Sequence, residues 1–212
     1  MNVAIPLYHH FTALDAIGPF EVLSRLPGAR VTWLGREPGP VRTDNGVALM
    51  ADAAYEDVPE PEIVLVPGGT GTDAVLDDER LVGWIRRAHE TSEWTTSVCT
   101  GSLLLGAAGV LDGLDATSHW LDLHTLERFG ARPTGRRVVE QGKVITAAGV
   151  SSGIDMGLVL ASRIAGDQVA QAIQLAIEYD PQPPFDAGSP DKAPESVVEF
   201  LRASSRFILE GT

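Results

Sequence analysis

Short apolar runs of strand length alternate with helical patterns along most of this chain, and this alternation limits its possible folds more than any other feature. The clearest run is EIVLVPGG, Glu62–Gly69, and similar runs lie at Asn2–Tyr8, Ala29–Gly35 and Trp94–Val98. A run that is apolar throughout indicates a strand covered on both faces. Helical patterns follow, most clearly at Asp78–Thr91 and Thr100–Val110. The order predicts an α/β fold, a flavodoxin-like parallel sheet with helices on both faces, whose ligand site lies at the carboxyl ends of the strands.

The rest of the chain fits the same plan. A first helical pattern runs from Ile17 to Leu26 and stops at Pro27-Gly28, and hairpins are expected around Asn45-Gly46 and within RVVEQGKVITAA. Further helices are expected near Trp120–Phe129, Ser152–Ala165, Asp167–Tyr179 and, after a proline-rich loop at 180–194, Glu195–Leu209. With 212 residues, 44% of them hydrophobic, the chain is expected to form a single domain over 1–212.

Charge and composition exclude several classes of partner. The net charge is −13 and Lys and Arg are not clustered, so we expect no nucleic-acid partner. Apolar runs are too short to cross a bilayer and the N-terminus lacks a cationic leader, so we expect no membrane partner and a soluble, cytoplasmic protein. One cysteine cannot form an internal disulfide, which suits a reducing compartment.

That cysteine, Cys99, falls where a predicted strand ends and the next helix begins. Such a turn, with small neighbours at Gly101 and Ser102, is typical of a nucleophile elbow. The positive end of the following helix should favour a reactive thiolate. The alternative is a cysteine that serves only as a small buried hydrophobic side chain.

Two other segments are expected at the same edge of the sheet. PGGTG follows a strand, and the backbone N–H groups of Gly68, Gly69 and Thr70 would suit an oxyanion or anionic intermediate. Asp15 lies early in the first helix. It could instead close a capping box with Thr12, but Pro19 would then sit too deep in the helix for that register.

Other residue patterns that could indicate a catalytic or metal site do not hold. Gly149-Val150-Ser151-Ser152-Gly153 matches G-x-S-x-G, but all five histidines precede Ser151, against the Ser, acid, His order of that hydrolase fold. A close-packed glycine turn explains the match better. The histidines also lack metal-binding spacing, so no metal site is predicted. If Cys99 is catalytic, a carboxylate is its expected partner. Asp15 is the leading candidate, and the sequence leaves open whether Asp15 or Glu21 lies nearer the sulfur.

Six segments together make the chain resemble the isonitrile hydratase branch of the ThiJ/PfpI superfamily, from about Val3 to Val198: LDAIGPFEVL, VPGGTG, SVCTGSLLLGAAGVLDG, ATSHW, GVSSGIDMGL and IQLAIEYDPQPPFDAGSP. The resemblance implies a cofactor-free hydro-lyase that converts a small-molecule isonitrile to an N-substituted formamide, with Cys99, Thr100 and Asp15 as catalytic residues. It also implies a homodimer. Thr100 stands where PfpI-type proteases carry His, which argues against peptide hydrolysis.

The residues fit this chemistry, because an isonitrile carbon must receive both a proton and an oxygen nucleophile. We expect Cys99 to attack the carbon while Asp15, with a raised pKa, donates the proton. The side chain of Thr100 could hold water or the developing nitrogen anion, and the N–H groups of Gly69 and Thr100 could stabilise charge. Two alternatives remain: a redox or thiol-sensing binding protein, and a deglycase-like hydrolase acting at the same cysteine.

Overall fold

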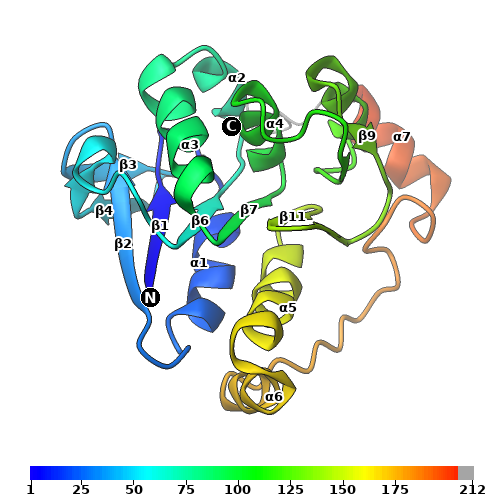
Figure 1. The fold of residues 1–212 in the computed structure, drawn as a ribbon. Helices are drawn as coiled ribbons and strands as arrows, with labels where there is room; N and C mark the ends of the chain where they lie inside the picture. The colour runs from blue at the N-terminus through cyan, green and yellow to red at the C-terminus, as the bar shows by residue number, and fades with distance from the viewer. Residues whose placement is uncertain (205–212) are drawn as a thin grey trace.

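A seven-stranded sheet forms the centre of the protein, for which a computed structural model describes residues 1–204 (Figure 1). Its spatial order is β10-β11-β7-β6-β1-β2-β5. The strands are β1 (Asn2–Pro6), β2 (Arg30–Gly35), β5 (Ala53–Ala54), β6 (Ile63–Val66), β7 (Trp94–Val98), β10 (Val138–Gln141) and β11 (Val144–Ala147). Every pair is parallel except β10 with β11. The predicted fold class is confirmed.

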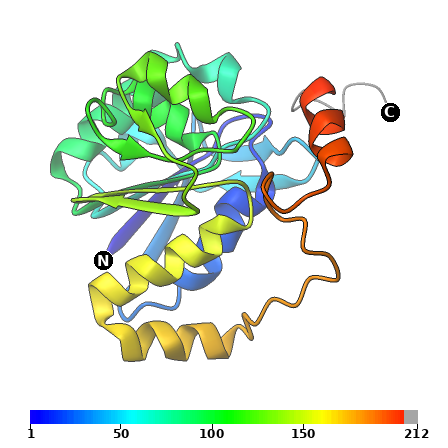
Figure 2. The ribbon, with the colours of Figure 1, turned by 90° about the vertical axis from the view of Figure 1, so that its right-hand side faces the viewer.

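Helices cover both faces of the sheet, as Figure 2 shows. One face carries α1 (Ala13–Leu23) and α5 (Ser152–Ala165), with α6 (Asp167–Ala176) packed on α5, and the other carries α2 (Thr72–Val75), α3 (Glu79–Thr91) and α4 (Gly101–Ala107). The start of α3 is capped, because the Asp78 side chain accepts a hydrogen bond from the Arg80 N–H at 3.0 Å. Its predicted apolar face is buried: Leu81, Trp84, Ile85 and Ala88.

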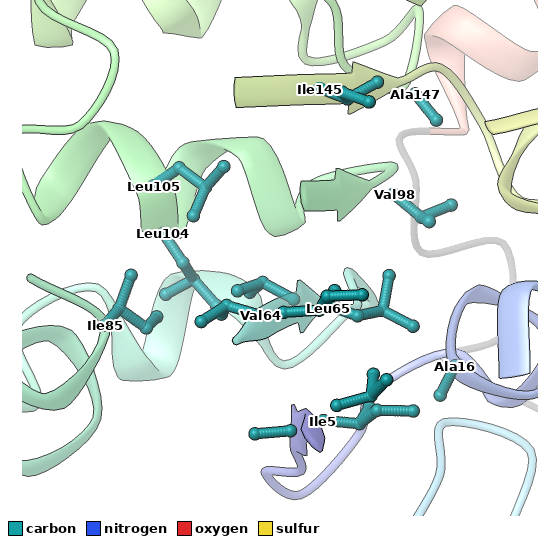
Figure 3. Close-up of a cluster of buried hydrophobic side chains, with 14 of the residues drawn as sticks. Ile5, Ala16, Val64, Leu65, Ile85, Val98, Leu104, Leu105, Ile145 and Ala147 are labelled. Carbon is teal, nitrogen blue, oxygen red and sulfur yellow. The ribbon is translucent and has the colours of Figure 1, made fainter. Parts of the chain in front are cut away.

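The core fills both sides of the central strands (Figure 3). β6 is buried along its whole length, as expected for a strand covered on both faces. Ile85 and Leu104 pack against this strand from α3 and α4, while Ala16 of α1 lies on the other side. Val98 ends β7 within the same cluster and brings the core directly up to Cys99.

Both predicted hairpins are present. β3 (Gly39–Arg42) and β4 (Ala48–Ala51) form a separate antiparallel pair around the Asn45-Gly46 turn, and β10–β11 forms an edge of the main sheet. Residues 180–190 contain no helix or strand, and α7 (Glu195–Ala203) follows the proline-rich segment. The last five residues of the helix expected at Glu195–Leu209 lie outside the described residues.

Some predicted helices are shorter or tighter than expected. The segment near 120–129 forms a 3-10 helix, η2 (Leu123–Phe129), which has no side-chain cap at its start and ends at Gly130, with φ 74°. α4 ends at Ala107, and Gly109 follows with φ 79°. The elements too short to leave a sequence pattern are α2, β5, β8 (Asp115–Ala116), β9 (Arg132–Pro133) and η1 (Tyr55–Asp57).

The loops that leave the carboxyl ends of β1, β6, β7 and β11 meet at one edge of the sheet, because these neighbouring strands run parallel. They carry residues 7–12, 67–71, 99–100 and 148–151. In the part of the chain that the structure describes, no helix is long and apolar enough to span a bilayer.

Candidate active site

Cys99 occupies the predicted elbow between β7 and α4, in a conformation that few non-glycine residues adopt. Its φ is 57°, in the left-handed region, which costs on the order of 1–2 kcal/mol for a residue with a Cβ. Hydrogen bonds hold the turn from both sides. The Cys99 N–H donates to the carbonyls of Ala147 and Ala148, and the Cys99 carbonyl accepts from the hydroxyls of Ser102 at 3.0 Å and Ser118 at 3.1 Å.

Asp15 lies in the first turn of α1 and is fully buried. Its Oδ2 accepts a hydrogen bond from the Gly68 N–H at 3.0 Å, which joins α1 to the loop after β6. Within the described residues its Oδ1 is buried and has no hydrogen-bond partner. Oδ1 is therefore the oxygen left to take or give a proton.

The capping-box alternative for Asp15 is wrong. Thr12 makes no side-chain cap, and its hydroxyl donates instead to Asp44 at 2.5 Å. The argument from Pro19 is wrong too, since α1 starts at Ala13 and contains Pro19. The proline ring packs against Gly153 of α5, where a Cβ would come within 3.0 Å of it.

Burial raises the pKa of both groups. The pKa of Asp15 rises from 3.8 to about 7, mainly because its carboxyl is removed from water, and the Gly68 N–H and the Cys99 thiol oppose part of that rise. Burial raises the pKa of Cys99 well above its usual value, and the negative charge of Asp15 raises it further. The raised pKa of Asp15 agrees with the one predicted, whereas the raised pKa of Cys99 runs against the predicted resting thiolate, since burial is the largest cause of that rise.

Two backbone N–H groups, from Thr100 and Val150, donate hydrogen bonds to Cys99 and lower the pKa of its thiol. They are suited to stabilise negative charge on the sulfur. Val150 was not among the predicted site residues. The sequence feature that could have indicated Val150 is the GVSSG turn. This turn follows β11, which begins 45 residues after Cys99, and it approaches the cysteine in the fold.

The PGG segment lies at the site but is arranged differently from the prediction. The Gly68 N–H is bound by Asp15, and the Gly69 N–H donates to the Thr100 hydroxyl at 2.9 Å, so in this structure neither is free to bind an oxyanion. Both positions require glycine. A Cβ on Gly68 would lie 2.4 Å from the Thr100 nitrogen, and Gly69 has φ 149°. Thr70 is half-buried, and no side-chain hydrogen bond joins it to the site within residues 1–204.

The Thr100 side chain ends a buried chain of hydroxyl groups that the sequence did not indicate. The Thr100 hydroxyl lies 2.7 Å from that of Thr72, which lies 2.9 Å from the Tyr8 hydroxyl. The Tyr8 hydroxyl also contacts the Pro67 carbonyl at 3.0 Å, and Thr72 donates to the Gly69 carbonyl at 2.8 Å. The expected role of the Thr100 hydroxyl in holding water or substrate is thus not favoured by its partners, which are protein groups.

Other candidates stand apart from the elbow. Ser151 is exposed and its hydroxyl accepts from Arg137 at 3.2 Å, while Gly149 and Gly153 approach His119 and Val98 closely, as predicted for a packed glycine turn. Glu21 pairs with Arg25 at 2.6 Å on the surface of α1. Over residues 1–204, no three His, Cys, Asp or Glu side chains are grouped as a metal site would require.

Comparisons with known proteins agree with the fold and with the resemblance. An isonitrile hydratase from Pseudomonas putida is 41% identical over 202 residues, covering 95% of this chain and 89% of that protein. A transcriptional regulator from Pseudomonas aeruginosa, CdhR, is 29% identical over 78% of this chain, which spans only 50% of the regulator.

Solved structures point the same way. A ThiJ/PfpI family protein from Pseudomonas syringae superposes with a TM-score of 0.94 at 36% identity, covering 97% of this chain and 86% of that one. Drosophila melanogaster DJ-1beta shares the fold with a TM-score of 0.76 at 22% identity, over 84% of this chain and 97% of its own. The model of the DJ-1/PfpI family matches residues 1–163. The chain therefore belongs to the DJ-1/PfpI family.

Proposed function

We propose that this protein is an isonitrile hydratase, which adds water to R–N≡C and releases the formamide R–NH–CHO. The observation that carries the proposal is the buried pair of Cys99 and Asp15, a thiol beside a carboxyl with a pKa of about 7. The 41% identity to the Pseudomonas putida enzyme over 95% of the chain supports it.

In the first step the Cys99 sulfur attacks the isonitrile carbon. The thiol proton passes to Asp15 and from Asp15 to the same carbon, so one C–S bond and one C–H bond form and the product is the thioimidate R–N=CH–S–Cys99. This route needs the pair to hold one proton and does not need a resting thiolate. The N–H groups of Thr100 and Val150 would stabilise charge on the sulfur as the proton leaves.

Water completes the reaction. Asp15 takes a proton from the attacking water as the C–O bond forms, and the nitrogen gains a proton, giving R–NH–CH(OH)–S–Cys99. The C–S bond then breaks, the hydroxyl proton returns through Asp15 to the sulfur, and the formamide leaves. No electrons are gained or lost overall, and each proton transfer can use Asp15, so the sequence of steps uses no cofactor.

Gly68 and Thr100 have positioning roles in this proposal. The Gly68 N–H holds Oδ2 of Asp15 and leaves Oδ1 for proton transfer. Thr100 contributes its N–H to the sulfur, while its hydroxyl fixes the Gly69 N–H. A buried sulfur with a raised pKa oxidises slowly, which favours turnover over the redox-sensing alternative.

The test compares two substitutions on the same helix. Asp15→Asn keeps the shape of the side chain but cannot carry a proton, so we expect formamide production to fall by at least about a hundredfold. Glu21→Gln, on the exposed face of α1, should keep normal activity. Formamide can be measured by proton NMR after addition of benzyl isonitrile.

The pH dependence of the activity should follow the protonation state of the Cys99–Asp15 pair. For the wild type, kcat/KM should rise with pH through about 7 as the pair loses its first proton, and fall only at strongly alkaline pH. Normal turnover by Asp15→Asn would contradict the mechanism. A wild type that makes no formamide would overturn the function and favour the deglycase-like alternative.

Because the thiol must stay reduced, we also propose that the protein acts in the cytoplasm.

A further inference from the structure

A pocket of about 380 Å³ lies beside the elbow, on the side of β11 and α5. Its walls are formed by residues 117–123, by residues 135–137 and 148–151 on either side of the β10–β11 hairpin, and by residues 188–190 of the proline-rich segment. Its volume is within the range of small-molecule sites.

Three residues that line this pocket also contact Cys99. The Ser118 hydroxyl donates to the Cys99 carbonyl at 3.1 Å, and the Ala148 carbonyl accepts the Cys99 N–H at 2.8 Å. The Val150 N–H is hydrogen-bonded to the cysteine side chain. The pocket therefore adjoins the turn that carries Cys99.

The walls combine apolar side chains with the hydroxyl groups of serine and threonine residues, and the guanidinium among them is neutralised. Trp120, Leu123, Val150 and Pro190 supply the apolar surface. Arg137 forms an ion pair with Asp155 and donates to Ser151 at 3.2 Å, so its charge is balanced within the protein. Such a surface favours a neutral ligand.

The side chain of Trp120 lies beside Arg202 and beside the preceding residue, His119. The Arg202 guanidinium of α7 lies 5.8 Å from the centre of its ring, within range of a cation–π contact. The His119 ring lies 6.0 Å away, and Gly149 leaves the space that His119 occupies. The proline-rich segment and α7 thus form part of this wall of the site.

We propose that this pocket binds the R group of the isonitrile and that Trp120, together with residues 188–190, selects bulky, uncharged R groups. This inference rests on the proposed function. The R–N≡C group is linear, so when its carbon meets the sulfur, R points away from Cys99. The adjoining pocket, with Trp120, Leu123 and Pro190 in its walls, is suited to receive it.

The test uses three substrates and three variants. Methyl isonitrile has almost no R group, benzyl isonitrile would fill the pocket, and isocyanoacetate carries a carboxylate. Trp120→Ala removes an apolar wall, Ser189→Trp fills the pocket, and Phe185→Ala, 77% exposed in the same proline-rich segment and outside the lining, is the control.

For the wild type, we expect kcat/KM to be at least about tenfold higher for benzyl isonitrile than for methyl isonitrile, and isocyanoacetate to be the poorest substrate. Trp120→Ala and Ser189→Trp should each lower kcat/KM for benzyl isonitrile by about tenfold or more, while methyl isonitrile changes less than about twofold. Phe185→Ala should match the wild type with all three substrates.

Equal losses for methyl and benzyl isonitrile in both variants would overturn the subsite and leave the proposed function standing. A wild type inactive toward every isonitrile would overturn the function and the subsite together. Thermal melting monitors folding. If Trp120→Ala does not fold, Ser189→Trp decides the question, because it adds a side chain at a partly exposed position.

Discussion

At the scale of single residues, the carboxyl of Asp15 is expected to destabilise the protein at the pH where it works. Its pKa is 3.8 when exposed to water and about 7 in the fold, so the folded state holds a proton that the unfolded chain has lost. This contribution to stability is fully present below pH 4 and disappears as pH rises through 7. Asp15→Asn should therefore be more stable than the wild type at pH 8, by at most on the order of 4 kcal/mol, with little difference at pH 4. Urea unfolding at both pH values checks this, and a difference independent of pH would contradict it.

Cys99 gives a second prediction at this scale, opposite to the one its position in the sequence suggested. Since burial and Asp15 raise the pKa of the thiol, iodoacetamide should label folded wild type more slowly than an unfolded-chain thiol at pH 7. Asp15→Asn removes the neighbouring negative charge, so the pH midpoint of labelling should move to lower values. Glu21→Gln should leave the midpoint unchanged. Fast labelling of the wild type at neutral pH would show that the sulfur is ionised in the fold.

At the scale of elements, the hydroxyl chain joins the loop after β1, the start of α2 and the elbow before α4 behind the site. Tyr8→Phe and Thr72→Val each remove a link, so the Thr100 hydroxyl loses part of its support, and we expect kcat to fall roughly three- to tenfold with little change in KM. Tyr55→Phe is the matched control, because its buried hydroxyl bonds the Leu7 carbonyl at 2.6 Å and no hydrogen bond links it to Thr100. A similar loss of kcat in all three variants would assign the effect to general destabilisation.

The elements that could be predicted were those with a long pattern. β6 is an unbroken apolar run, α3 has a regular apolar face, and both hairpins have turn signals. α2 and β5, of four and two residues, are too short for any period to show. The segment before Phe129 was expected to be an α-helix, because its apolar spacing does not distinguish an α-helix from the 3-10 helix that forms.

The residues of the candidate site also divide into those that could be predicted from the sequence and those that could not. Cys99 and Asp15 could be selected because each follows a strand that ends at the same edge of the sheet. The Val150 N–H and the hydroxyls of Tyr8 and Thr72 could not, because their roles depend on how distant loops pack. The helix end beside Cys99, which favours a thiolate, could be inferred from its position, but the burial that raises the pKa of the thiol could not.

At the scale of the whole molecule, we propose that residues 1–212 act as a single domain and that two copies associate. The resemblance implies a homodimer, and exposed apolar side chains such as Leu14, Val47 and Met50 are available on the described surface. Light scattering at micromolar concentration should give twice the chain mass of 22.5 kDa. A particle of 22.5 kDa would contradict the dimer.

The bonds from the Cys99 N–H to the carbonyls of Ala147 and Ala148 also set when the thiol becomes protected during synthesis. A ribosome adds about 5–20 residues per second, so roughly 2–10 seconds separate the appearance of Cys99 from that of Ala148. Until β11 pairs with β7, the nascent chain lacks the burial that raises the pKa of this thiol. The chain's one cysteine is therefore most vulnerable to oxidation while the protein is being made. A delay in translation between these two codons should increase the fraction of molecules that are oxidised at Cys99 and therefore inactive.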